Sequence, residues 1–132
     1  MLKILLVDDD EDEHLFFKWS MEKVGVQAEV LHAFSAHQAL GVVTQNTPHL
    51  IFLDINLPGA DGFECLQEIR KKPLVRDVPV YMFSTSISEE TVQRAAILGA
   101  TGCIKKSRNH EQLATLISNA LQPSQQPQHT AK

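Results

Sequence analysis

The sequence is poor in cysteine: Cys65 and Cys103 are isolated and show no CxxC spacing. We therefore expect two buried, reduced thiols rather than a redox or thiolate metal motif. The six histidines likewise lack metal-ligand spacing such as HExxH, so we interpret them as solvent-facing or ordinary structural side chains.

Positive charge and long apolar runs are also scarce. The 12 basic residues are outnumbered by 16 acidic ones, and the net charge of −4 gives no electrostatic footprint for nucleic acid. No apolar run approaches the roughly 20 residues of a membrane span, and no signal-peptide pattern opens the chain. We expect a cytoplasmic protein that binds neither nucleic acid nor membrane.

The chain has enough apolar residues, 43% of 132, for one globular domain with one core. Several short apolar runs are bounded by turn residues and separated by stretches of helical period, which is typical of a parallel sheet covered on both faces. The expected strands are Leu2 to Val7, Ala28 to Ala33, Leu50 to Leu53, Val78 to Phe83 and, more weakly, Gly102 to Ile104.

Five helices are expected between and after these strands. The first spans roughly Glu13 to Val24, and the second follows an N-cap at Ser35. The third starts after Asp61 and stops before Pro73. The last two are a helix that opens with Ser86 and Glu89 in capping-box spacing and ends at Gly99, and a helix from about Asn109 to Leu121.

Five βα units with right-handed crossovers predict a doubly wound, flavodoxin-like α/β fold with a five-stranded parallel sheet of order 2-1-3-4-5. This domain covers residues 1–121. Residues 122–132 contain two prolines and almost nothing apolar, so we expect a disordered tail.

Polar residues stand where the expected strands end. Asp8 and Asp9 follow the first strand, Asp54 ends the third, Ser84 ends the fourth, and Lys106 follows the fifth. Ligands of such sheets bind outside the carboxyl ends of the strands, so we expect these side chains to gather at one rim.

The three aspartates require a positive partner, because two carboxylates about 5 Å apart repel by roughly 3 kcal/mol at an effective dielectric of 20. Oxygen ligands with room for water and phosphate favour Mg²⁺. A carboxylate beside such an ion, with a hydroxyl and a lysine nearby, suits phosphoryl transfer to aspartate. Asp54 is the expected nucleophile, and Asp8 and Asp9 the expected metal-binding pair.

Four stretches in this order and spacing resemble the response-regulator receiver family over about residues 2 to 121. They are Leu5 to Asp9, Leu53 to Gly62, Met82 to Thr85, and Gly99-Ala100 followed by Lys106. With no effector domain attached, the chain resembles the single-domain, chemotaxis-regulator-like members.

The resemblance implies that Asp54 is phosphorylated, that Asp8 and Asp9 hold Mg²⁺, and that the backbone carbonyl of Asn56 completes the protein ligands. Ser84 and Lys106 would bind phosphoryl oxygens. A histidine kinase or histidine phosphotransfer protein would be the donor, and a downstream protein would read the switch. In this reading the chain is a signalling domain, which at most catalyses its own phosphorylation and dephosphorylation.

Three departures from the family pattern affect this comparison, of which Ser84, in place of the more frequent threonine, is a permitted variant. Ser107 stands where the family usually has proline, so the Lys106-Ser107 bond has little reason to be cis. Cys103 replaces the switch aromatic, so the usual coupled movement of hydroxyl and ring cannot operate in its usual form.

Three alternatives are weighed. A phosphatase of the haloacid-dehalogenase type would need a DxD motif near the first strand, whereas here the acidic pair comes first and the partner of Asp54 is Asn56. An FMN-binding flavodoxin would need a first loop that cradles phosphate, which the acidic residues from Asp8 to Glu13 would repel. Within the receiver reading, a partner-binding switch and a phosphorelay shuttle remain open.

Two surfaces are expected to bind partners. Leu15 and Trp19 lie one turn apart, off the inward stripe of the first helix, and form a candidate kinase-docking surface as that helix does in the family, although an aromatic leaning on the helix flank explains them equally well. The surface from Glu89 to Leu121 is the candidate output face, because Ser84 can pull its loop toward a bound phosphoryl group.

Overall fold

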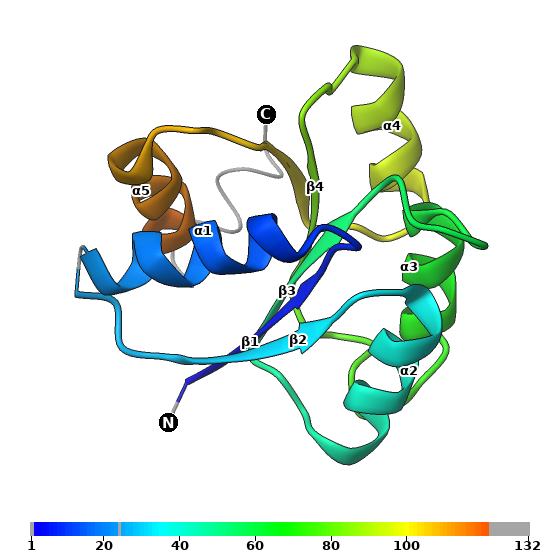
Figure 1. Ribbon diagram of the computed structural model, residues 1–132. Helices are drawn as coiled ribbons and strands as arrows, with labels where there is room; N and C mark the ends of the chain where they lie inside the picture. Colours follow the sequence, from blue (N-terminus) through cyan, green and yellow to red (C-terminus); the bar gives the residue numbers. More distant parts are fainter. Residues whose placement is uncertain (1, 24, 122–132) are drawn as a thin grey trace.

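The computed structural model describes residues 2–23 and 25–121, which form a five-stranded parallel sheet of order β2-β1-β3-β4-β5 (Figure 1). The flavodoxin-like prediction is confirmed, and each strand lies within two residues of its expected bounds. The strands are β1 (Lys3–Val7), β2 (Glu29–Ala33), β3 (Leu50–Asp54), β4 (Val80–Ser84) and β5 (Gly102–Lys105).

Helices cover both faces of the sheet, so the central strands are buried on both sides. Helices α1 and α5 pack together on one face, where Phe17 and Ile117 contact the core around Phe52. Helices α2, α3 and α4 lie on the other face. Their bounds are α1 (Glu11–Lys23), α2 (Ala36–Gln45), α3 (Gly62–Arg70), α4 (Glu89–Ile97) and α5 (His110–Ala120).

Side-chain caps set where three helices begin, and the sequence predicts the first of these caps, at Ser35. The Ser35 hydroxyl accepts a hydrogen bond from the Gln38 amide at the start of α2. Asp61 and Glu64 form a complete capping box at α3. Asn109 caps α5. These caps satisfy amides that have no partner inside the helix, which stabilises each boundary.

The predicted start of α4 is wrong. Its N-cap is Ser88, whose hydroxyl accepts from the Thr91 amide at 3.1 Å, rather than Ser86. The Ser86 amide instead points to the Ser84 hydroxyl at 3.4 Å, so this residue belongs to the loop after β4. The predicted end is confirmed, because Gly99 takes the left-handed conformation with φ of 101°.

Helix α1 begins at Glu11, two residues before its predicted start. The carboxylate of Asp10 accepts a hydrogen bond from the Asp12 amide at 2.9 Å, and the Asp10 carbonyl accepts from the Glu13 amide at 3.0 Å. Acidic residues favour the positive end of a helix dipole, so the first turn can form without an apolar residue.

The expected tail, residues 122–132, and Val24 of the expected first helix lie outside the described residues. Within residues 2–23 and 25–121, no helix is long and apolar enough to cross a bilayer.

Candidate functional site

Three carboxylates meet at the carboxyl end of the sheet, as predicted. Ligand oxygens of Asp8, Asp9 and Asp54 all lie within 4.8 Å of one another. The cause is the sheet register: Val7 of β1 lies beside Leu53 of β3, so the next residue of each segment, Asp8 or Asp54, is a neighbour of the other. Asp8 and Asp54 are buried, whereas Asp9 is exposed.

Backbone amides orient the two buried carboxylates. The Asp10 amide donates to Oδ1 of Asp8 at 2.9 Å, and the Asn56 amide donates to Oδ1 of Asp54 at 3.2 Å. The loop after Asp54 is held tightly, because the Gly62 amide donates to the Ile55 carbonyl at 2.6 Å. A Cβ at Gly62 would collide with the Asp54 carbonyl, which explains why glycine stands there.

Lys106 brings the opposite charge into the cluster. Its Nζ lies 2.7 Å from Oδ2 of Asp8 and 3.5 Å from Oδ2 of Asp54. The shorter contact is an ion pair rather than a well-directed hydrogen bond, since Oδ2 of Asp8 is buried without a hydrogen bond of good geometry from the described residues. The Lys106 amide donates to the Ser84 carbonyl at 2.8 Å, which ties the lysine to the end of β4.

The protonation of the site reflects this crowding. Burial raises the pKa of Asp54 to about 6, the negative charge of Asp8 adds to the rise, and Lys106 and the Asn56 amide only partly oppose it. Burial acts to lower the pKa of Lys106, but its contacts with Asp8 and Asp54 outweigh that effect and raise it. One ammonium therefore does not fully compensate the carboxylates, and the oxygen-rich cluster fits a divalent cation such as Mg²⁺.

Ser84 and Cys103 lie on the strands beside this cluster. Ser84 is buried at the end of β4, next to Lys105 of β5 in the register. Cys103 lies beside Met82 and packs against the core as a half-buried free thiol, and burial raises its pKa. Cys65 is a free, buried thiol, as predicted, whereas the prediction of full burial is wrong for Cys103. The described residues contain no cis peptide bond, so the Lys106-Ser107 bond is trans, also as predicted.

On α1, Leu15 and Trp19 are exposed by 62% and 57% of their surfaces. They line a shallow concave surface together with Phe16 and Arg108. The Trp19 ring meets the His110 ring edge-on at 4.3 Å between centroids, so this part of α1 contacts the first residue of α5. Leu15 and Trp19 thus share one surface, which none of the three clustered aspartates lines.

Sequence reasoning missed His14, which it grouped with the ordinary histidines. His14 is 3% exposed, and its Nε2 lies 2.8 Å from the carbonyl oxygen of Asp8. The position of His14 directly after the run of acidic residues was the one sequence feature that could have drawn attention to it. Its contact with His32 on β2 joins distant parts of the chain, so no local pattern predicts it.

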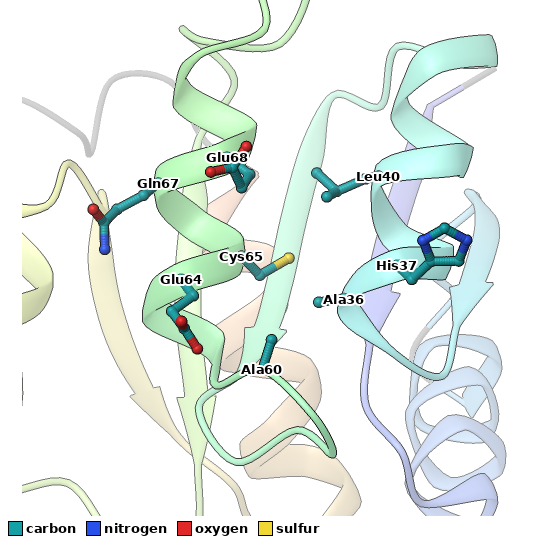
Figure 2. A pocket seen from close by; sticks show the side chains of 8 residues that line it. All are labelled: Ala36, His37, Leu40, Ala60, Glu64, Cys65, Gln67 and Glu68. Atoms are coloured by element: carbon teal, nitrogen blue, oxygen red, sulfur yellow. The ribbon is translucent and has the colours of Figure 1, made fainter.

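A separate groove lies between α2 and α3 (Figure 2). The Cys65 thiol points from α3 toward α2, and Glu64 and Glu68 stand on the α3 side. None of the three clustered aspartates lines this groove, so it is not part of the acidic site.

Comparison with known proteins gives one family and several close structures. The profile of the response regulator receiver domain matches residues 4–118. A probable chemotaxis protein CheY of Rhizobium etli is 28% identical over 116 residues, which cover 88% of this chain and 89% of the relative.

Two solved structures share the fold over most of both chains. The Mn²⁺-bound form of response regulator Rcp1 is 27% identical, with a TM-score of 0.80 over 93% of this chain and 96% of that one. The phosphorylated cyanobacterial phytochrome response regulator RcpA is 32% identical, with a TM-score of 0.77 over 88% of each chain.

Proposed function

The chain belongs to the response regulator receiver domain family of two-component systems, and we propose that it is a switch in which Asp54 accepts a phosphoryl group from a phosphohistidine in a Mg²⁺-dependent reaction. The observation that carries the proposal is the cluster of Asp8, Asp9 and Asp54 with Lys106 beside it. Asp8 and Asp9, with Asp54 and the carbonyl of Asn56, would hold the ion. When bound, Mg²⁺ supplies positive charge next to the phosphoryl oxygens.

The residues divide the chemistry between them. The Asn56 amide occupies Oδ1 of Asp54, so Oδ2, which faces Lys106, is the oxygen that attacks phosphorus. The new O–P bond forms as the P–N bond to the donor histidine breaks, and the imidazole leaves with the electron pair and takes up a proton. Lys106 neutralises charge on the phosphoryl oxygens, and the Ser84 hydroxyl donates a hydrogen bond to one of them.

The direct test is to incubate the protein with acetyl phosphate and Mg²⁺, and to measure the intact mass. We expect a gain of one phosphoryl group with Mg²⁺ and none when the metal is chelated. The related structures of a Mn²⁺-bound and a phosphorylated receiver support this proposal by similarity. The alternatives of a haloacid-dehalogenase phosphatase and a flavodoxin are not favoured, since the whole domain matches the receiver family.

The role of the phosphorylated state, partner-binding switch or phosphorelay shuttle, depends on its lifetime. A switch needs a persistent aspartyl phosphate, whereas a shuttle needs one that passes readily to another histidine. We propose the switch, with a histidine kinase or phosphotransfer protein as donor and a downstream protein as reader. A cytoplasmic location and a domain that ends at residue 121 belong to the same proposal.

Phosphorylation is expected to change the surface formed by α4, β5 and α5, which contains a hollow of about 640 Å³. Ser84 can draw the following loop toward the phosphoryl group and so move α4. With beryllofluoride, a mimic of that group, NMR spectra should show shifted amide signals in α4 and β5. Because Cys103 lacks a ring, these shifts should be smaller than in a relative with tyrosine. Shifts confined to the acidic pocket would contradict the output face, and Asp54→Asn serves as the unresponsive control.

Replacing Trp19 by alanine is expected to slow phosphotransfer from the cognate kinase several-fold, because large exposed aromatics often dominate the binding energy of an interface. Phosphorylation by acetyl phosphate should stay unchanged, since this donor needs no docking surface. Leu74→Ala, which removes another exposed apolar side chain outside α1, is the matched control. Unchanged transfer from the kinase to the Trp19→Ala variant would remove the docking proposal.

A further inference from the structure

A pair of histidines, the buried His14 and the exposed His32, lies directly beside the acidic cluster. His14 of α1 places Nε2 2.8 Å from the carbonyl oxygen of Asp8 and Nδ1 2.7 Å from Nδ1 of His32 on β2. The ring of Phe34 lies 4.3 Å from the His14 ring between centroids. The His14 ring is therefore fixed on three sides, by the loop after β1, by strand β2 and by the segment after β2.

The hydrogen bonds determine where the protons are. A carbonyl oxygen can only accept, so Nε2 of His14 carries a hydrogen and donates it to Asp8. In a neutral His14, Nδ1 is then the acceptor, and Nδ1 of His32 must be the donor. Burial, followed by the charges of the neighbouring His14 and Lys18, lowers the pKa of His32, and a neutral His32 with its hydrogen on Nδ1 can make this bond.

The bond to the Asp8 carbonyl has a geometric consequence for Asp9. That carbonyl belongs to the planar peptide between Asp8 and Asp9, so fixing its oxygen fixes the orientation of the whole peptide. The Asp9 carboxylate has no hydrogen-bond or ion-pair partner among residues 2–23 and 25–121, so its direction depends on its backbone. Asp8 has further support, because the Asp10 amide donates to its Oδ1.

We infer that His14 is a positioning residue for the metal site: its Nε2 hydrogen, held in place by His32, fixes the Asp8-Asp9 peptide so that both carboxylates face the cation. This inference rests on the proposed function, which assigns Mg²⁺ to the acidic cluster. In other metal sites, side chains that hydrogen-bond to the metal ligands orient these ligands, and their loss typically weakens metal binding by about 10 to 100 fold. We assign this role to the His14–His32 pair.

Two substitutions at position 14 separate the bond to Asp8 from the bond to His32. The amide nitrogen of glutamine reaches the place of Nε2, whereas the amide of asparagine reaches only that of Nδ1. His14→Gln therefore keeps the donor to Asp8, and His14→Asn loses it. We expect His14→Asn to raise the Mg²⁺ dissociation constant about 10-fold and His14→Gln to change it by less than about 3-fold, measured by titration calorimetry.

The matched control is Ser20→Ala, which removes a buried hydrogen bond on the same helix, from the Ser20 hydroxyl to the Phe16 carbonyl. It should lower the melting temperature without Mg²⁺ but leave the dissociation constant unchanged. If the role of His14 were purely structural, His14→Asn would likewise lower the melting temperature and leave the Mg²⁺ dissociation constant unchanged.

The outcomes distinguish the two proposals. A wild-type protein that binds no Mg²⁺ overturns the metal site of the proposed function itself. A wild-type protein that binds Mg²⁺, together with equal affinities for His14→Asn and His14→Gln, overturns only the role of His14. If His14→Asn does not fold, His14→Ala takes its place, because alanine also lacks the donor to the Asp8 carbonyl. A Mg²⁺ affinity of His14→Ala equal to that of His14→Gln then overturns the inference.

Discussion

Asp54→Asn is expected to abolish phosphorylation by acetyl phosphate, because the amide that replaces the carboxylate has no anionic oxygen to attack phosphorus. Asn is close in size to Asp and can keep the hydrogen bond from the Asn56 amide, so the loop after β3 should retain its conformation. Intact-mass measurement with Mg²⁺ should show one added phosphoryl group on the wild-type protein and none on the variant.

Two further variants make this result specific. Asp9→Ala should still be phosphorylated on Asp54, but should require more Mg²⁺, because it loses an exposed metal ligand and keeps the nucleophile. Asp61→Asn, in the capping box of α3, replaces an aspartate of the same loop and should leave phosphorylation intact. An Asp54→Asn protein that gains the same acid-labile phosphate would refute the assignment of the nucleophile.

The sequence predicts the sheet and the acidic cluster because both depend on local patterns. Short apolar runs such as Leu50 to Leu53 identify the strands, and the residues at strand ends must meet at one edge of a parallel sheet. Likewise, the sequence predicts that the third helix starts after Asp61, and the N-cap of α3 is a local hydrogen bond from the Glu64 amide to the Asp61 carboxylate.

Predictions from the sequence fail where the local pattern is ambiguous or where a contact joins residues far apart in the chain. Ser86 and Ser88 both stand three residues before a residue suited to the first turn of a helix, so the sequence alone does not choose between these caps. The environment of His14 depends on His32, which lies 18 residues away on another element. The sequence predicts that Lys106 and Asp8 lie at the same rim, but the 2.7 Å contact between them joins residues far apart in the chain and follows only from the folded sheet.

Crowding of Asp54 should also be visible in the stability of the unphosphorylated protein. Folding raises the pKa of this carboxyl from 3.8 to about 6 through burial and the charge of Asp8. Below about pH 4 the group is neutral in both the folded and the unfolded chain, so it adds no penalty. Above about pH 6 it is ionised in both, and the folded state bears the full electrostatic cost. Stability from this group is therefore lost as the pH rises from about 4 to 6.

Without Mg²⁺, Asp54→Asn should therefore melt several degrees above the wild type at pH 7.5, since about 1 kcal/mol shifts the melting temperature of such a domain by a few degrees. The difference should shrink toward zero near pH 4, and Mg²⁺ should reduce it at pH 7.5 by stabilising the wild type more than the variant. Thermal unfolding followed by circular dichroism measures both effects. Glu22→Gln, which neutralises an exposed carboxylate on α1, should show no comparable gain. A difference in melting temperature that does not vary with pH would show that the substitution acts through packing rather than through the charge of Asp54.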